Sequence, residues 1–348
     1  MCDSEQCLDQ LLGYLISDSA HSVQRVPSDS EEKRILVRSL MNIRAPVPVS
    51  PDLLRIQDRY LRARNAERGI VGEKDIQTVG DTLGTDDDHS DTIAIWQGDI
   101  TTLECDAIVN AANSGMLGCF QPCHACIDNC IHTFAGIQLR LECDAKMHAL
   151  RQEHGSDYEQ PTAVPMLTDA YNLPCRKVIH IVGPIVHSEL DDKLENDLAD
   201  CYVRVLDMCR DNGLRTVAFC CISTGVFRFP NQRAAEIAVR SVKDWLDDNK
   251  GYMDKVIFNV FLEKDRRIYE GLLSQGPRRL PRDDLRRDEG YELLGPEAGP
   301  REGYTGGEPE EAEGGHRQFR CHSRRSRSRR QHQRRTDIRR RAFHEILR

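Results

Sequence analysis

The sequence has few aromatic residues and no long apolar run. Only 6% of its 348 residues are Phe, Trp or Tyr. Apolar stretches such as VIHIVGPIV end far short of the roughly 20 residues that a membrane-spanning helix needs. The N-terminal sequence MCDSEQCLDQLLGYL lacks the basic region and the small-residue cleavage site of a secretory signal. We therefore expect no membrane partner and an intracellular protein of the cytoplasm, with the nucleus as the alternative location.

This expected location decides how the 14 cysteines are interpreted. In a reducing compartment, cysteines remain thiols or bind metal ions, whereas disulfide frameworks belong to secreted proteins. The cysteines are therefore candidates for metal ligands wherever they stand close to histidine.

Basic charge is confined to the C-terminal end of the chain. Residues 317–348 contain 13 arginines and two acidic residues, which is a charge of +11. Since the whole chain carries −8, the 316 residues before this stretch carry −19. A basic segment attracts phosphate backbones, and RSRSRR is a possible phosphorylation site. Because the segment lacks interleaved aromatics and the rest of the chain is acidic, we expect nucleic-acid contact as an accessory property at most.

Composition divides the chain into four parts. Apolar residues at helical spacing predict three helices in residues 1–75, which we interpret as a helical N-terminal extension. Residues 76–91 contain GDTLGTDDDHSD and are predicted to be a mobile acidic linker. Residues 92–275 have the pattern of a folded domain. Residues 276–348 are rich in Pro, Gly and charge, which predicts a disordered tail.

The domain in residues 92–275 alternates between apolar runs and helical patterns. The apolar runs are TIAIWQ, DAIVNAA, KVIHIVG, TVAFCCI and KVIFNVF. Strands that alternate with helices predict an α/β sheet with helices on both faces. Ligands of such sheets bind at loops that leave the carboxyl ends of the strands. The segments in these positions are QGDI, NSGMLGCF and STGVFRFP.

One of these loops carries candidate metal ligands. Cys119, His124 and Cys126 form a C-x4-H-x-C pattern, and three protein ligands with an open fourth position are typical of catalytic zinc. Cys123 and Cys130 lie nearby, and Cys123-x2-Cys126 also has the spacing of half a structural zinc site. The alternative is a group of buried or merely reduced thiols.

The other candidate positions are polar residues near predicted strand ends. In STGVF, Gly225 permits a close approach of the backbone, and the helix predicted after it brings a positive end near an anion. Asp99 is either a helix or turn cap or a carboxylate that accepts a hydrogen bond from a base amine. Asn113 is either a turn residue or a contact to a sugar hydroxyl. His132 is expected to pack or to hydrogen-bond inside its helix.

Together these segments resemble a known family. GDIT, DAIVNAANSGMLGCF, YNLPCRKVIHIVGP and STGVFRFP occur in the order and spacing of a macrodomain, over about residues 92–273. GCFQPCHACIDNCIHTFAG is similar to the zinc-containing macrodomain class, the protein-ADP-ribose hydrolases of bacteria and fungi. LVRSLMNIRAPVPVSPDLLRIQDRYL resembles the extension that precedes the macrodomain in that class. The resemblance implies a three-layer α/β/α macrodomain with a mixed central sheet, preceded by a small helical extension.

The resemblance also implies a role for each candidate residue. Asp99 and Ile100 would recognise the adenine end of ADP-ribose, and Asn113 would face the distal ribose. Zn²⁺ would be held beside that ribose by Cys119, His124 and Cys126. Ile127 and Asp128 would line the site. The diphosphate would be wrapped by Ser223, Thr224, Gly225, Val226 and Phe227.

The activity implied by the resemblance is zinc-dependent removal of mono-ADP-ribose from modified protein side chains, by cleavage at C1″ of the distal ribose. Departure from C1″ builds oxocarbenium character, as in glycoside hydrolysis, and zinc can polarise a ribose hydroxyl or a water. Asn113 would orient the ribose, and Asp128 would act as an orienting residue or a base. The alternative is an ADP-ribose-binding reader module without turnover. Three metal ligands at the distal ribose favour the hydrolase, because a reader does not need them.

Overall fold

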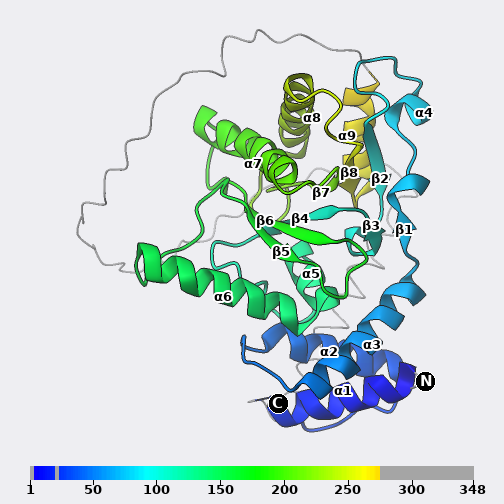
Figure 1. The fold of residues 1–348 in the computed structure, drawn as a ribbon, viewed down its shortest axis with the longest axis vertical. Helices are drawn as coiled ribbons and strands as arrows, with labels where there is room; N and C mark the ends of the chain where they lie inside the picture. The colour runs from blue at the N-terminus through cyan, green and yellow to red at the C-terminus, as the bar shows by residue number, and fades with distance from the viewer. Residues whose placement is uncertain (1–3, 20–22, 275–348) are drawn as a thin grey trace, which may run out of the picture. The chain divides into compact units, whose positions relative to one another are not determined.

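The computed structural model describes residues 4–19 and 23–274 (Figure 1). The predicted tail, residues 276–348, lies outside the described residues, as does any contact between its arginines and nucleic acid. No helix in the described part of the chain is long and apolar enough to cross a membrane.

The N-terminal extension consists of three helices, α1 (Ser4–Asp18), α2 (Ser30–Ile43) and α3 (Pro51–Arg68). The carboxylate of Asp29 caps α2 by accepting from the backbone N–H groups of Glu31 and Glu32, at 2.9 and 3.0 Å. The hydroxyl of Ser50 caps α3. Apolar residues at helical spacing face inward and form a second hydrophobic core, which also includes Ile137 of the following domain.

The main sheet has six strands. Their order is β2 (Ile93–Gln97), β8 (Lys255–Val260), β7 (Thr216–Phe219), β4 (Ala107–Ala112), β6 (Lys177–Val182) and β5 (Met166–Asp169). All neighbouring pairs are parallel except β5 and β6. The prediction of a mixed α/β sheet is therefore confirmed. The sequence pattern did not predict β5, because its four residues, MLTD, contain only two apolar side chains.

Five helices cover the two faces of the sheet. They are α5 (Ile127–Ala135), α6 (Ile137–His154), α7 (Asp192–Asp211), α8 (Asn231–Asp248) and α9 (Glu263–Leu273). Figure 1 shows α7, α8 and α9 on one side and α5 and α6 on the other. The helix expected after Ile127 is interrupted at Gly136, which has a φ of 100°. A Cβ there would lie 2.7 Å from the amide nitrogen of Gln57 in α3, so this break lets the extension approach closely.

The segment expected to be a mobile linker, residues 76–91, carries a short helix in the structure, α4 (Val79–Leu83). Thr78 and Asp81 form a capping box at its start. Ile76 and Val79 are buried in the main core, and Asp87 pairs with Lys243 of α8 at 2.6 Å. Short elements before and after it are β1 (Val71–Gly72), η1 (Glu73–Asp75), η2 (Ile100–Thr102) and β3 (Leu103–Glu104), with β1 and β3 paired in parallel.

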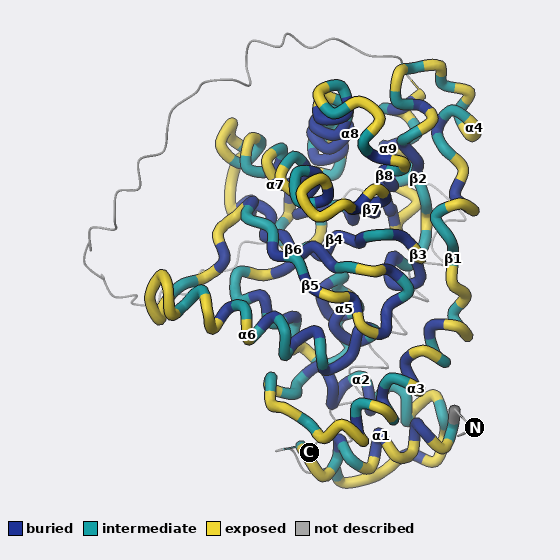
Figure 2. The backbone as a smooth tube through the Cα atoms, in the orientation of Figure 1, coloured by how far each residue is buried: buried dark blue, intermediate teal, exposed yellow. Residues whose placement is uncertain are grey.

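Burial follows these layers, and the central strands are buried almost throughout (Figure 2). The most exposed large apolar side chains among the described residues are Val226 at 69%, Phe261 at 64% and Leu262 at 55%. All three follow the carboxyl ends of β7 or β8. Apolar groups exposed at one edge of a buried sheet mark that edge as a candidate binding surface.

Candidate functional site

Four parallel strands bring most of the predicted site residues to one edge of the sheet. Asp99 follows β2 and Asn113 follows β4. The STGVF loop, residues 223–227, follows β7, and Phe261 follows β8. Since β2, β8, β7 and β4 are consecutive in the sheet and parallel, their carboxyl ends share an edge.

At the β2 end of this edge, Asp99 caps η2 and keeps part of its carboxylate exposed. One oxygen accepts from the backbone N–H of Thr101 at 3.0 Å and from its hydroxyl at 2.6 Å. The other oxygen pairs with the guanidinium of Arg68 from α3. The side chain is still 43% exposed and can accept a further hydrogen bond. Ile100, by contrast, is buried in the core, which leaves its backbone as the group that can contact a ligand.

The STGVF loop has the geometry of an anion-binding turn. Ser223 has a φ of 63°, in the left-handed region that non-glycine residues rarely adopt. Its hydroxyl is buried and has no hydrogen-bond partner in the structure. The backbone N–H groups of Gly225, Val226 and Phe227 donate to no backbone carbonyl of the described residues, and a Cβ on Gly225 would point into open space. Consecutive free N–H groups beside a glycine can bind phosphate oxygens.

The shape of this loop depends on the neighbouring loop after β6. The backbone N–H of Val186 donates to the carbonyl of Phe227 at 2.9 Å. A Cβ on Gly183 would lie 2.2 Å from the Ser223 hydroxyl and 2.7 Å from the Ile222 side chain. Only glycine therefore lets the two loops pack at this distance.

The candidate metal ligands converge in the loop between β4 and α5; residues 119–126 are here named the metal loop. The ligand atoms of Cys119, His124 and Cys126 all lie within 4.8 Å of one another, with Cys119 Sγ 3.5 Å from His124 Nδ1. Cys126 caps α5, and its sulfur accepts from the backbone N–H of Asn129 at 3.4 Å. A hydrogen bond from the Cys126 thiol lowers the pKa of Cys119. Thiolate character of this kind favours metal binding.

The two additional cysteines do not join this group. The sulfur of Cys123 lies 3.1 Å from the Ser39 hydroxyl of α2, and the sulfur of Cys130 accepts from Arg38 at 3.4 Å. Both therefore point to the extension. The structure supports a three-residue ligand set over the half structural site with Cys123.

Asp128 lies next to the metal loop and is buried, with 4% of its surface exposed. Its two oxygens accept hydrogen bonds from Asn110 at 2.8 Å and from Asn113 at 3.2 Å. Burial raises the pKa of the Asp128 carboxyl to about 6. Ile127, one residue earlier, is partly buried and packs against the core.

A second group, His132, Cys143 and His180, also has its ligand atoms within 4.8 Å of one another. The hydrogen bonds of His180 do not suit a metal. The amide of Asn110 donates to its Nδ1 at 3.0 Å, so the proton is on Nε2 and faces the Thr168 hydroxyl at 3.0 Å. His132 is buried, and neither ring nitrogen has a hydrogen-bond partner among the described residues. Its Nε2 lies 3.6 Å from a carboxylate oxygen of Asp128, and its ring packs against Gly118.

Sequence reasoning missed Phe261. Its backbone carbonyl accepts at 3.3 Å from the side chain of Gln97, the last residue of β2, and Asp99 follows two residues later. An exposed aromatic ring at a strand end can stack on a nucleobase. The apolar run KVIFNVF predicts a strand that includes Phe261. In the structure β8 ends at Val260, so Phe261 lies beyond the sheet.

Comparison with known proteins gives matches in sequence and in structure. Residues 109–238 match the family model described as Macro domain. A protein-ADP-ribose hydrolase of Treponema medium is 51% identical over 266 residues, which cover 76% of this chain and 97% of the relative. One from Staphylococcus aureus (strain MSSA476) is 42% identical over 265 residues, covering 74% and 93%. The crystal structure of a Trypanosoma brucei macrodomain in complex with ADP-ribose superposes with a TM-score of 0.51 at 27% identity, covering 71% of this chain and 97% of that chain.

The residues that match the family model, 109–238, run from β4 into α8 and include the metal loop and the STGVF loop. A sequence identity of 51% that extends over 97% of the relative's length means that the two proteins share a fold. The chain belongs to the macrodomain family.

Proposed function

We propose that this protein is a zinc-dependent hydrolase that removes mono-ADP-ribose from modified protein side chains by cleavage at C1″ of the distal ribose. The observation that carries the proposal is the cluster of Cys119, His124 and Cys126 beside Asn113 and Asp128. The activity named for the relatives from Treponema medium and Staphylococcus aureus supports the same reaction.

ADP-ribose would lie along the carboxyl edge of the sheet. Asp99 offers a partly exposed carboxylate to the adenine amine, and Phe261 offers a ring to stack on the base. The free N–H groups of the STGVF loop would bind the diphosphate. The distal ribose would then lie by Asn113, near the metal loop.

The metal loop fits a zinc ion by its chemistry. Two thiols and one imidazole at mutual distances below 4.8 Å are a set that zinc prefers, and three ligands leave one coordination position open. When bound, zinc would supply a Lewis acid that polarises an oxygen close to the distal ribose.

The protein's own residues would orient the ribose and stabilise the charge that develops at C1″. The Asn113 amide is held by the Gly118 carbonyl and by Asp128, each at 3.2 Å, so its position is defined before a ligand arrives. The Asp128 carboxylate, fixed by two amides, would place negative charge near the forming oxocarbenium ion or accept a proton from the attacking water.

The experiment is release of ADP-ribose from a mono-ADP-ribosylated protein, with metal content measured on the same sample. We expect the chain to hold one zinc ion, and His124→Ala and Cys126→Ala to lose both the zinc and the release activity. Cys209→Ala, which removes a buried thiol of α7 far along the chain from the loop, is the control and should keep both.

The competing function is a reader module that binds ADP-ribose without turnover. Tight ADP-ribose binding by calorimetry without any release over hours would favour the reader. Undiminished release by zinc-free His124→Ala would leave a macrodomain hydrolase that does not use the metal.

A further inference from the structure

The extension does more than pack on the macrodomain, because one face of α2 bonds directly to the metal loop. The guanidinium Nη2 of Arg38 donates to the His124 backbone carbonyl at 2.9 Å and to the Asn129 side-chain oxygen at 2.8 Å. Asn129 is buried, and its amide in turn donates to the carbonyls of Cys119 and Gln121 at 3.2 and 2.9 Å. Arg38 thus reaches both ligand-bearing ends of the loop.

Two buried polar residues of α2 hold the middle of the loop. The Asn42 side-chain oxygen accepts from the backbone N–H of Cys123 at 2.9 Å, and its amide donates to the Thr133 hydroxyl at 2.9 Å. The Ser39 hydroxyl lies 3.1 Å from the Cys123 sulfur. Cys123 has a φ of 50°, a left-handed conformation that is unfavourable for a cysteine. The bonds from α2 stabilise that conformation at the residue that precedes His124.

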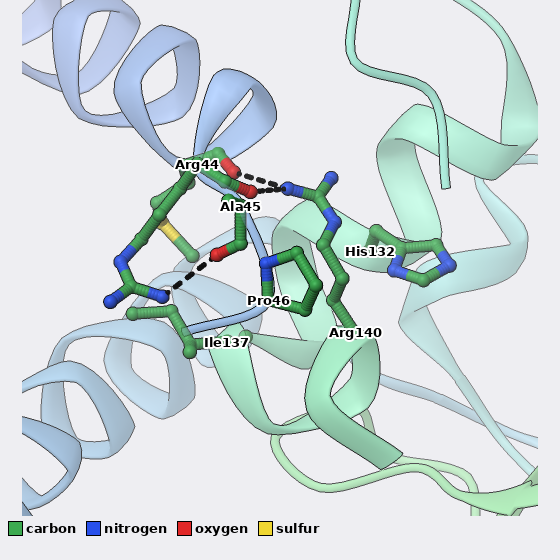
Figure 3. A pocket seen from close by; sticks show the side chains of 8 residues that line it. Arg44, Ala45, Pro46, His132, Ile137 and Arg140 are labelled. Carbon is green, nitrogen blue, oxygen red and sulfur yellow. Dashed lines mark hydrogen bonds between the residues drawn. The ribbon is translucent and has the colours of Figure 1, made fainter. Parts of the chain in front are cut away.

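A third contact joins Arg140 of α6 to the end of α2 (Figure 3). Arg140 of α6 is buried, and its Nη1 lies 3.1, 3.0 and 2.5 Å from the carbonyl oxygens of Met41, Asn42 and Arg44 at the C-terminal end of the helix. Its Nε donates to the Leu117 carbonyl at 2.8 Å. A cation at the C-terminal end of a helix is favourable, so this single side chain joins the end of α2 to Leu117, two residues before the metal loop.

These contacts matter because the loop has no regular structure of its own between β4 and α5. Holding the two thiols and the imidazole close together beforehand reduces the conformational entropy that is lost when the metal binds, and so raises the affinity. Partners outside the ligand set commonly change metal affinity by about 10- to 100-fold.

We infer that α2 is part of the metal site: Arg38, Ser39 and Asn42 are positioning residues that hold the metal loop in its ligand-binding conformation, so that the extension sets the affinity for zinc. This inference rests on the proposed metal site.

The test compares two arginines of the same helix in the full chain. Arg38→Met keeps the aliphatic stem and removes the donor to the metal loop. Arg34→Met, one turn earlier, removes a guanidinium whose ion pairs, within residues 4–19 and 23–274, are with Glu5, Glu31 and Glu67 of the extension. Zinc affinity is measured by competition with a chromophoric chelator. We expect Arg38→Met to bind zinc at least about tenfold more weakly than wild type and Arg34→Met to match wild type.

Arg38→Lys is the conservative variant. One ammonium cannot reproduce the fork geometry of the guanidinium, so its zinc affinity should lie between those of wild type and Arg38→Met. The visible spectrum with Co²⁺ in place of zinc reports the ligand set itself. At the same Co²⁺ concentration, Arg38→Met should show weaker thiolate bands than wild type. ADP-ribose affinity, measured on the same proteins, should fall far less than zinc affinity.

Equal zinc affinity in wild type and both Arg38 variants would overturn the inference. Equal losses in Arg38→Met and Arg34→Met would also overturn it, since a general loosening of the extension would then be the cause. Absence of zinc binding by wild type itself would remove the metal from the proposed function, and the role of α2 with it.

Discussion

The side-chain amide of Asn113 lies 3.2 Å from the carboxylate of Asp128. This hydrogen bond joins the loop after β4 to the first turn of α5 and spans the whole metal loop. The two residues thus form one polar unit at the end of the site where the distal ribose would lie.

Asp128→Asn should reduce release of ADP-ribose by roughly 100-fold or more, the scale of a lost acid–base or charge-stabilising group. The new side chain keeps one oxygen, which can accept from only one of the amides of Asn110 and Asn113, while its NH2 group would face the other donor and that hydrogen bond would be lost. Single-turnover release is the measurement, and zinc content should remain that of wild type. Release at the wild-type rate would show that Asp128 takes no part in the cleavage.

Gly183→Ala should weaken ADP-ribose binding while leaving the metal site intact. The added methyl would lie 2.2 Å from the Ser223 hydroxyl and 2.7 Å from the Ile222 side chain. These side chains must move, and we expect the STGVF loop to move with them. Calorimetry with ADP-ribose measures the effect. Gly271→Ala is the control, because a Cβ there meets no atom within 4 Å. Equal affinities for the two variants would contradict the assigned role of the loop.

Phe261→Ala should weaken ADP-ribose binding by about 5- to 150-fold, the equivalent of the roughly 1–3 kcal/mol that base stacking contributes. Because the side chain is 64% exposed, its removal should hardly change the melting temperature. Phe261→Tyr keeps a ring of the same shape and should restore binding. An unchanged affinity in the alanine variant would place the adenine elsewhere.

Glu195→Gln should change the pH dependence of stability. Arg233 donates twice to this carboxylate, at 2.7 and 2.5 Å, and this pairing lowers the pKa of Glu195. A carboxyl with a lowered pKa in the folded state stabilises the protein above its unfolded pKa, and that contribution is lost as pH falls through the folded value. The Gln variant should be less stable at pH 7 by about 1 kcal/mol or less, since the pair is partly exposed.

The measurement is urea unfolding of both proteins between pH 7 and pH 3. The difference in the free energy of unfolding should shrink toward acid, because protonated Glu195 no longer pairs with Arg233. A difference that stays constant with pH would mean that the ion pair contributes nothing to stability.

Most strands of the main sheet and most residues of the candidate site could be predicted from the sequence alone. Buried parallel strands need continuous apolar runs, so five of the six strands of the main sheet could be located from composition. The candidate metal ligands could be named because Cys119, His124 and Cys126 are close in sequence. The STGVF loop could be named because glycine and polar residues follow a strand. The break at Gly136 and the short helix at Val79 could not be located, since both depend on packing against distant segments.

Only the tertiary structure decided which residues from distant parts of the sequence contact these motifs. Nothing in the sequence pairs Arg38 with His124, which is 86 positions away, or turns Cys123 from the metal ligands to Ser39. The spacing in the sequence determines which candidate ligand side chains can lie close together, because a short loop keeps them near one another in any fold. Their orientation is set by hydrogen bonds from α2, and such long-range contacts form only once the extension has packed against α5 and α6.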